Sequence, residues 1–348
     1  MKHTILVTGG TGYIGSWVVK GLLEKGHTVR LTVRKEGNKE KYQFLTDIAE
    51  INEGSLEIWE ADLLRTGSFD EAAKGCDSIA HMASPFILNV KDAQKDLVDP
   101  AVRGTTNVLE AANKSNSVKK VVLTSSVVAI YGDSIDMKNQ NLSILTEEQF
   151  NTTSSLSHQP YSYSKVQAEK KAWELAKQQS SWKLIVLNPS FVMGPSLTSN
   201  SQSESLKFMT EMLSGKFKTG VAELYLAYVD VRDVAKAHIF CLENKAEGRH
   251  ILSERVTDML SFANIIRAHY GNTYKLPKSN NPKWLMKLIG GLFGLSRKYV
   301  KNNVEIPIQM DTTKSIEKLN LNYIPLEQTV KDMVEQMESF QRTTTSNK

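Results

Sequence analysis

The sequence reads Thr8-Gly9-Gly10-Thr11-Gly12-Tyr13-Ile14-Gly15 near its start, with glycines at intervals of three. An apolar, β-rich stretch, Thr4–Thr8, precedes this segment, and residues 16–25 follow it with the apolar spacing of a helix. Glycines at such a turn let the backbone approach a pyrophosphate, and the helix N-terminus offers unpaired N–H groups to the phosphates. The segment therefore predicts a nucleotide-binding βα unit, with a purely structural turn as the alternative.

Strands and helices continue to alternate beyond this turn. Strands are expected at residues 28–34, 56–59, 77–82, 118–125 and 182–187, and helices at 68–74, 98–114 and 161–179. Alternation of this kind is typical of a mostly parallel sheet with helices on both faces. The predicted fold class is α/β, a Rossmann-type doubly wound parallel sheet with a smaller, discontinuous C-terminal substrate-binding lobe.

The second half of the chain is less regular and predicts the lobe. We assign residues 1–195 and 228–247 to the nucleotide-binding domain, 196–227 and 248–342 to the substrate-binding lobe, and 343–348 to a flexible tail. Residues 284–295 are apolar but too short to span a membrane. They are interpreted as a buried helix of the lobe, with a membrane-touching or substrate-lining segment as the alternative.

Composition excludes several classes of protein. The 348 residues carry a net charge of +5, two cysteines and no block of five basic residues. Cys76 and Cys241 cannot form a disulfide framework or a cysteine-rich zinc site, and they are expected to be buried thiols. The start of the chain lacks the pattern of a secretion signal. We therefore expect a cytoplasmic protein with no metal, no nucleic-acid partner and no membrane partner.

The end of the second predicted strand indicates which cofactor is bound. An NAD enzyme places an acidic residue there to bind the ribose 2′-OH. This chain has Val33-Arg34-Lys35, and its first acid is Glu36. A guanidinium suits a 2′-phosphate, so we predict NADPH rather than NADH. A solvated basic loop is the alternative interpretation.

Two pairs of polar residues indicate acid–base chemistry on a carbonyl or alcohol. Tyr161 and Lys165 are four residues apart at the start of a predicted helix, so they share one face. An ammonium beside a phenol stabilises the phenolate and so assists proton exchange with a substrate oxygen. Ser125 and Ser126 end a buried strand, where a hydroxyl faces the ligand crevice of an α/β protein or simply caps a turn.

Taken together, these motifs resemble the extended short-chain dehydrogenases/reductases. The chain is most similar to the group of dihydroflavonol reductases, cinnamoyl-CoA reductases and related aldehyde, ketone and methylglyoxal reductases, from Thr4 to about Val334. Further motifs that carry the resemblance are Ala61-Asp62-Leu63, His81-Met82-Ala83-Ser84-Pro85-Phe86, Asn188-Pro189 and Tyr228-Val229-Asp230.

The resemblance implies roles for individual residues. It implies that Ser126 (or Ser125 in the alternative register), Tyr161 and Lys165 are catalytic, and that Arg34 holds the 2′-phosphate with Lys41 as a helper. Asn107 either fits a superfamily asparagine or is a polar helix residue. Cofactor contacts are implied for Thr8, Gly9, Gly12, Tyr13, Ile14, Gly15, Asp62, Leu63, Ala83, Ser84, Thr124, Tyr161, Lys165, Pro189 and Val192. From their positions beside the motifs, Phe86, Val127, Phe191 and Tyr228 are expected to line the substrate pocket.

The expected activity is NADPH-dependent reduction of an aldehyde or ketone to an alcohol by a monomer or homodimer. One alternative is an NAD-dependent sugar-nucleotide epimerase or dehydratase of the same superfamily. Another is a catalytically silent nucleotide-sensing protein. The plant flavonoid enzymes carry substrate-binding residues in the region of residues 131–136 that this chain lacks, which argues against a flavonoid substrate.

Overall fold

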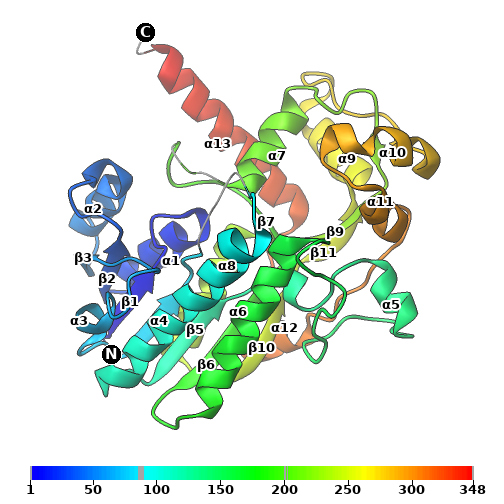
Figure 1. Cartoon of the computed structure of the whole chain (residues 1–348). Coiled ribbons are helices and arrows are strands. Elements are labelled where there is room, and N and C mark those ends of the chain that lie inside the picture. The colour runs from blue at the N-terminus through cyan, green and yellow to red at the C-terminus, as the bar shows by residue number, and fades with distance from the viewer. Residues whose placement is uncertain (1, 85–89, 200, 202, 347–348) are drawn as a thin grey trace.

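A computed structural model of the chain describes residues 2–84, 90–199, 201 and 203–346 (Figure 1). Its main feature is a parallel sheet in the strand order β10-β6-β5-β4-β1-β2-β3. The strands are β1 (Thr4–Thr8), β2 (Thr28–Val33), β3 (Ser55–Glu60), β4 (Ser78–His81), β5 (Lys120–Thr124), β6 (Lys183–Pro189) and β10 (Gly248–Leu252). This sheet confirms the predicted Rossmann-type α/β fold.

Helices cover both faces of the sheet because its strands are apolar on both sides. In β1, Ile5 and Val7 belong to one core cluster and Leu6 to the other. On the first face lie α1 (Tyr13–Glu24), α2 (Gln43–Glu50), α8 (Val231–Glu243) and α12 (Thr313–Leu319). On the second lie α3 (Asp70–Ala73), α4 (Asp99–Ser115) and α6 (Pro160–Lys177).

The lobe has its own apolar core beside the sheet's C-terminal edge (Figure 1). Its main sheet has the order β11-β9-β7, and a short pair joins β12 to β8. The strands are β7 (Phe191–Met193), β8 (Val221–Ala222), β9 (Tyr225–Asp230), β11 (Arg255–Asp258) and β12 (Asn280–Asn281). The helices are α7 (Glu204–Leu213), α9 (Met259–Tyr270), α10 (Lys283–Ile289), η4 (Gly290–Phe293), α11 (Arg297–Asn303) and α13 (Leu326–Ser346).

The structure differs from the predicted division of the chain at β10. Residues 248–252 were expected in the lobe, but they pair in parallel with β6, with Gly248 opposite Ile185 and Leu252 opposite Pro189. Parallel pairing at a sheet edge joins segments far apart in sequence, so local pattern does not reveal it. The predicted return of the chain to the large domain at residues 228–247 therefore extends to residue 252.

The structure also corrects the interpretation of residues 284–295 as a buried helix. This stretch forms α10 and η4, in which Met286 is buried while Trp284, Leu288 and Leu292 are exposed. Within the described part of the chain, no helix is long and apolar enough to cross a membrane. Cys76 and Cys241 are buried free thiols, as predicted.

Candidate active site

The glycine turn joins β1 to α1 and requires glycine at two positions. Gly9 has a φ of +73°, and a Cβ added there would lie 2.6 Å from the backbone nitrogen of Ala83. A Cβ on Gly15 would lie 2.2 Å from the carbonyl oxygen of Gly9. A Cβ on Gly12 would meet Gly9 oxygen at 3.2 Å. Gly12 is also the N-cap of α1. A residue without a side chain at this position leaves the N–H groups of the helix N-terminus accessible to a phosphate.

Tyr13 and Trp17 tie this turn to the start of the lobe. The Tyr13 hydroxyl donates to the carbonyl oxygen of Gly194 at 2.5 Å, and Trp17 Nε1 donates to that of Pro195 at 2.9 Å. Burial, with the nearby charge of Asp230, raises the pKa of Tyr13 well above its ordinary value. The phenol of Tyr13 therefore fixes the turn against the chain that follows β7.

A cleft of about 490 Å³ lies beside the glycine turn, between the large sheet and the lobe. It brings together residues that were predicted from separate motifs. The predicted residues that line it are Gly9, Gly12, Tyr13, Ile14, Gly15, Thr124, Ser126, Val127, Tyr161, Phe191 and Val192. The cleft therefore combines the predicted nucleotide-binding turn with two of the three predicted catalytic residues.

Tyr161 lies in the first turn of α6, where the local backbone directs it into the cleft. Gln159 precedes the helix with a left-handed φ of 55°, and Pro160 occupies the first turn, where its missing N–H costs nothing. The Tyr161 side chain is about half exposed, at 54%. Lys165 Nζ lies 5.8 Å from the centre of the Tyr161 ring, so the predicted helix face is confirmed.

Gln159 is itself held by a buried network. Its Nε2 donates to Asp133 Oδ1 at 2.7 Å, and Asp133 also pairs with His158 Nε2 at 2.7 Å. Asn302 and Asn303 of α11 donate to the same carboxylate, each at 2.7 Å. The lobe and the start of α6 are thus fixed to one buried aspartate.

The two serines after β5 have different surroundings. Ser125 is buried, and its hydroxyl donates to Glu169 Oε2 at 2.5 Å. Ser126 lines the cleft with Tyr161, and its Oγ accepts from Val128 nitrogen at 3.3 Å. The Ser126 hydroxyl also lies 3.5 Å from the carbonyl oxygen of Pro189. The Ser125 hydroxyl is therefore part of a buried hydrogen-bond network, whereas Ser126 is exposed to the cleft.

Glu169 was not singled out from the sequence, yet it is the centre of a buried hydrogen-bond network beneath the site. Besides Ser125, its carboxylate accepts from Asn188 Nδ2 at 2.9 Å and from Arg249 Nε at 2.6 Å. Asn188 in turn donates to the carbonyl oxygen of Ser126 at 3.1 Å. The signal available in the sequence was its position four residues after Lys165, on the same helix face.

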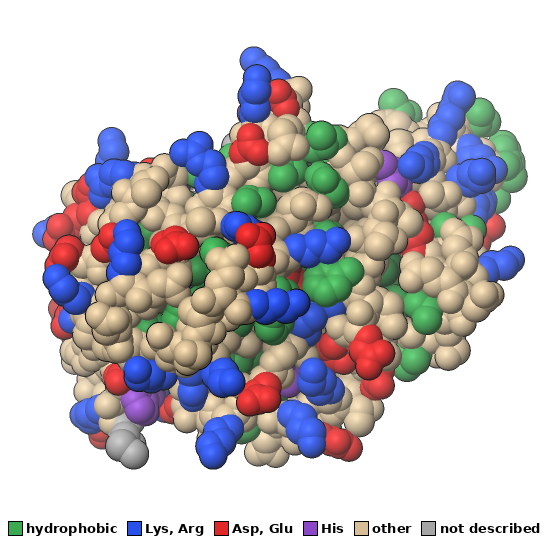
Figure 2. Space-filling view, turned by 60° about the horizontal axis from the view of Figure 1, so that its bottom comes forward, with side chains coloured by type: hydrophobic (Ala, Val, Ile, Leu, Met, Phe, Trp, Pro, Cys, Tyr) green, Lys and Arg blue, Asp and Glu red, His purple; other side chains and the backbone are tan. Residues whose placement is uncertain are grey.

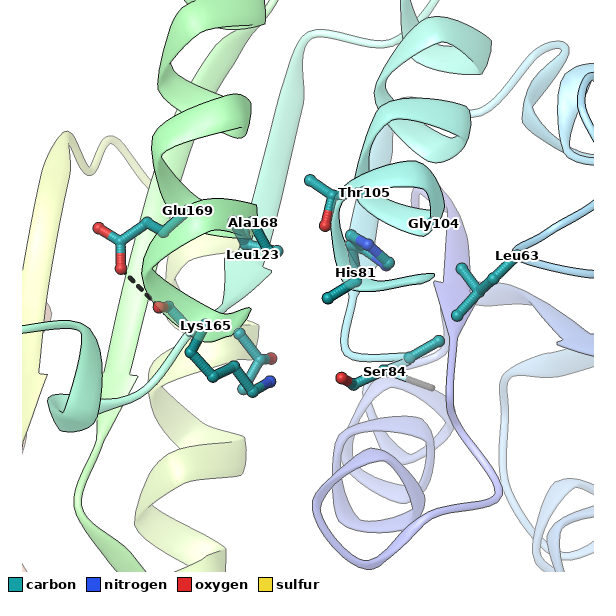
Figure 3. Close-up of a pocket in the computed structure, with 13 residues that line it drawn as sticks. Leu63, His81, Ser84, Gly104, Thr105, Leu123, Lys165, Ala168 and Glu169 are labelled. Atoms are coloured by element: carbon teal, nitrogen blue, oxygen red, sulfur yellow. Dashed lines mark hydrogen bonds between the residues drawn. The ribbon is translucent and has the colours of Figure 1, made fainter. Parts of the chain in front are cut away.

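Lys165 and Glu169 also line a second, smaller pocket (Figure 3). Figure 3 shows Lys165 and Ser84 on opposite sides of this pocket, with the bond from Ser125 to Glu169 dashed. Of the predicted cofactor residues it gathers Leu63, Ala83, Ser84, Thr124 and Lys165. Thr124 lines both pockets, so the two sets of predicted cofactor residues that line them meet at the C-terminal end of β5.

Two buried histidines support this edge in their neutral form. His81 Nδ1 lies 2.8 Å from Thr8 Oγ1, and burial together with the charge of Lys165 lowers the pKa of His81 to about 3. His238 Nδ1 bonds the carbonyl oxygen of Val234, so its Nε2 accepts from Thr124 at 2.6 Å. Burial lowers the pKa of His238 to about 4. His81 is thus a core residue whose ring is hydrogen-bonded.

Asn107 of α4 holds the loop that contains the predicted cofactor contacts Asp62 and Leu63. Its Oδ1 accepts from the backbone nitrogen of Gly67, and its Nδ2 donates to the carbonyl oxygen of Arg65 at 2.7 Å. Asp62 Oδ1 accepts from the backbone nitrogen of Leu64 at 2.8 Å within the same loop. Asn107 therefore positions this loop from α4.

Arg34 and Lys41 lie apart from both pockets. Arg34 follows the C-terminal end of β2, is exposed, and forms no side-chain hydrogen bond or ion pair with another described residue. Lys41 is exposed in the short helix η1 (Lys39–Lys41). An unpaired guanidinium at this strand end remains free to bind an anion.

The predicted substrate walls are only partly brought together. Val127 and Phe191 line the cleft, whereas Phe86 lies outside the described residues. Tyr228 differs from the prediction because it is fully buried and stacked on Phe262, with ring centres 5.2 Å apart. Tyr228 instead packs into the lobe core, while Leu226 and Ala227 of the same strand line the cleft, as does Tyr131.

Metal chemistry has no visible site among the described residues. No group of three or more His, Cys, Asp or Glu side chains there has the arrangement to hold a metal ion. The polar side chains that line the cleft are instead the hydroxyls of serine, threonine and tyrosine residues and the carboxylate of Glu204. Such groups suit an organic cofactor and its substrate.

A family model and several known proteins match this chain. The model described as the NAD dependent epimerase/dehydratase family matches residues 5–253. Cinnamoyl-CoA reductase CAD2 of Medicago truncatula is 33% identical over 341 residues, which cover 97% of this chain and 96% of the plant protein.

Solved structures match over the same span. Gre2 of Candida albicans in complex with NADPH has a TM-score of 0.79 and 33% identity, covering 97% of this chain and 99% of Gre2. The yeast methylglyoxal/isovaleraldehyde reductase Gre2, complexed with NADPH, has a TM-score of 0.79 and 26% identity, with coverage of 97% and 99%.

Proposed function

The chain belongs to the NAD dependent epimerase/dehydratase family, and on that premise we propose that it reduces an aldehyde or ketone to an alcohol with NADPH. It is an oxidoreductase of the extended short-chain dehydrogenase/reductase type. One observation carries the proposal: the Ser126 hydroxyl and the Tyr161 phenol line one cleft with the glycine turn, and Lys165 lies beside the phenol.

The residues around the glycine turn fit a dinucleotide. A Cβ at Gly9 or Gly15 would collide with the backbone, so this cradle is shaped for close approach. The exposed guanidinium of Arg34 is free to pair with a 2′-phosphate, which supports NADPH as the cofactor. Thr124 lines both pockets, and Lys165 lines the smaller pocket beside Tyr161, a position suited to a nicotinamide ribose.

When bound, NADPH supplies the hydride that reduces the carbonyl carbon. The Ser126 hydroxyl donates a hydrogen bond to the carbonyl oxygen and stabilises the charge that develops there. The Tyr161 hydroxyl transfers its proton to that oxygen, so the product is a neutral alcohol and the phenol becomes a phenolate. The Lys165 ammonium stabilises the phenolate until a solvent proton restores the phenol.

The cleft favours a carbonyl compound with an apolar group. Val127, Val128 and Tyr131 line one part of its wall, and Phe191 and Leu226 line another. Contact with apolar walls releases water and favours substrates with hydrocarbon or aromatic substituents. Isovaleraldehyde is therefore expected to be a better substrate than methylglyoxal, whose two carbonyls carry only a methyl group. These two compounds are named for the yeast relative.

NADPH oxidation against a carbonyl panel tests the proposal. Tyr161→Phe is expected to lower kcat about 10²- to 10⁴-fold, because the proton donor is lost, while NADPH binding stays unchanged. Tyr163→Phe, on the same helix but outside the lining of the cleft, is the matched control and should retain activity. Wild-type turnover by Tyr161→Phe would refute the assignment.

The same assay separates the two serines. Ser126→Ala is expected to lower kcat because a donor to the carbonyl oxygen is lost. Ser125→Ala is expected to lower the free energy of unfolding by about 1.5–3 kcal/mol, because a buried bond to a carboxylate is lost. A larger loss of kcat in Ser125→Ala than in Ser126→Ala would reverse their roles.

A sugar-nucleotide epimerase or dehydratase remains the second candidate because the family includes such enzymes. That activity predicts retained NAD and an acid after β2, where this chain has Arg34. Adding a sugar nucleotide to the panel tests it directly. Conversion of that compound without net NADPH oxidation would favour the second candidate.

A further inference from the structure

The positive charge of this protein is concentrated in one part of the lobe. Residues 259–304 contain eight Lys or Arg and no Asp or Glu. The whole chain carries +5, so the remaining residues together carry −3. This segment includes α10, η4 and α11, and we call residues 283–303 the basic tip.

The basic tip is a folded helical hairpin with a defined inner side. Met286 of α10 and Val300 of α11 are buried in the lobe core. Gly290 lets the two arms approach, because a Cβ there would lie 3.3 Å from Val300 Cγ2. The backbone nitrogen of Leu295 donates to the carbonyl oxygen of Gly290 at 2.9 Å and closes the connection. The outer side chains therefore project from a fixed backbone.

Large apolar side chains occupy the outer side. Trp284 and Leu288 are one helical turn apart and are 65% and 68% exposed, while Leu292 of η4 is 85% exposed. Figure 2 shows hydrophobic and basic side chains gathered at the end of the molecule where Figure 1 places α10. Contiguous exposed apolar side chains rimmed by polar ones commonly mark interaction sites.

The cations around these apolar groups are unpaired. Lys287, Arg297, Lys298 and Lys301 are exposed, and none forms an ion pair with another described residue. Elsewhere on the surface, pairs such as Lys171 with Glu174 are common. The charges of the tip are therefore available to an external anionic surface.

We propose that the basic tip binds the surface of an anionic lipid bilayer. Trp284, Leu288 and Leu292 would enter the interfacial region, where tryptophan is favoured. The surrounding cations would meet the negative lipid head groups. A second copy of the chain fits less well, because a symmetric contact would bring the two positive tips together. This proposal departs from the expectation of no membrane partner.

Vesicle flotation of the full-length protein tests the proposal. Wild type is expected to float with vesicles of phosphatidylcholine containing one third phosphatidylglycerol, and not with phosphatidylcholine alone. Binding should weaken between low salt and about 0.15 M salt, since screening shortens the range of the attraction. Failure to float with the anionic vesicles at low salt would overturn the proposal.

Two pairs of matched variants locate the binding surface. Leu288→Ser with Leu292→Ser, and separately Lys287→Glu with Lys298→Glu, are each expected to lower the partition constant at least about tenfold. The apolar control is Ile51→Ser on the large domain, where Ile51 is 83% exposed. The charge control is Lys183→Glu with Lys245→Glu, which changes the net charge equally. Equal losses in controls and tip variants would contradict the proposal.

Two further measurements keep the outcome interpretable. Each variant should retain wild-type NADPH oxidation, which reports intact folding, because no tip residue lines the cleft. Sedimentation velocity tests the alternative that a second copy of the chain binds the tip. A wild-type dimer that Leu288→Ser with Leu292→Ser converts to a monomer, without vesicle binding, would assign the tip to a second copy and overturn the proposal.

Discussion

The cleft and the basic tip both present polar side chains to solvent, but they hold them differently. Around the cleft, Glu169 accepts bonds from Ser125, Asn188 and Arg249 below the reacting hydroxyls. On the tip, the charged ends of Lys287 and Lys298 extend freely from their helices. Supported groups suit a reaction that needs one geometry. Unsupported ones suit a partner such as a fluid lipid surface, whose charges have no fixed positions.

Acidification is expected to change the free energy of unfolding the most. It acts through buried histidines beside the cleft, where the polar groups are held by hydrogen bonds. The pKa values of His81 and His238 are lowered to about 3 and about 4 in the folded protein. Below the ordinary value near 6.5 the unfolded chain binds more protons, so the free energy of unfolding falls as pH drops towards 4. Each histidine contributes about 1.4 kcal/mol per pH unit in this range.

Urea unfolding measured at several pH values checks this slope. His81→Gln is expected to flatten the dependence of the free energy of unfolding on pH between about 6.5 and 4, because one such group is removed. The matched control is His269→Gln, since His269 is exposed on α9. Identical slopes in both variants would show that burial of His81 does not govern the acid response.

Breaking the Glu169 network is expected to have the next largest effect. Glu169→Ala leaves the buried guanidinium of Arg249 without its carboxylate, which should cost about 3–5 kcal/mol of unfolding free energy. Glu174→Ala is the control on the same helix, because its pair with Lys171 is exposed and should contribute less than about 1 kcal/mol. Urea unfolding of the two variants measures both losses. Similar losses in the two variants would show that the buried network of Glu169 contributes no more to stability than an exposed ion pair.

Removing Arg34 is expected to have the smallest of these effects, and one confined to the cofactor. Arg34→Ala should raise the Kd for NADPH about 10- to 100-fold, because bonds to a phosphate are lost, and should leave the Kd for NADH unchanged. Arg297→Ala on the tip is the control and should change neither value. Fluorescence titration measures both. Equal weakening for the two cofactors would contradict a contact with the 2′-phosphate.

Local patterns predicted the nucleotide-binding half of the fold well. The span Thr4–Thr8 is the first strand as expected, and α1 follows the glycine turn, because turn, strand and helix are encoded within a few neighbouring residues. Tyr161 and Lys165 share a face for the same reason, as fixed helical periodicity relates them. Their chemical roles stay predictions until the variants are assayed.

Features that depend on distant segments were missed. Glu169 reads as an ordinary helical acid until Arg249, eighty residues later, is brought against it. Tyr228 was expected in the pocket wall, but it is buried in the lobe core, where its ring stacks on Phe262 of α9. The apolar residues 284–295 were expected to be buried, since hydrophobicity alone does not show which side of a helix finds a partner.

The place of β10 at the edge of the large sheet affects how the protein folds during synthesis. Its partner β6 leaves the ribosome well before it, and the lobe segments that contain β7, β8 and β9 are made in between. Until residues 248–252 emerge, β6 is an unprotected edge that can pair with another nascent chain. A chain truncated before Gly248 would carry that open edge permanently. Such a fragment is therefore expected to aggregate through the exposed edge of β6.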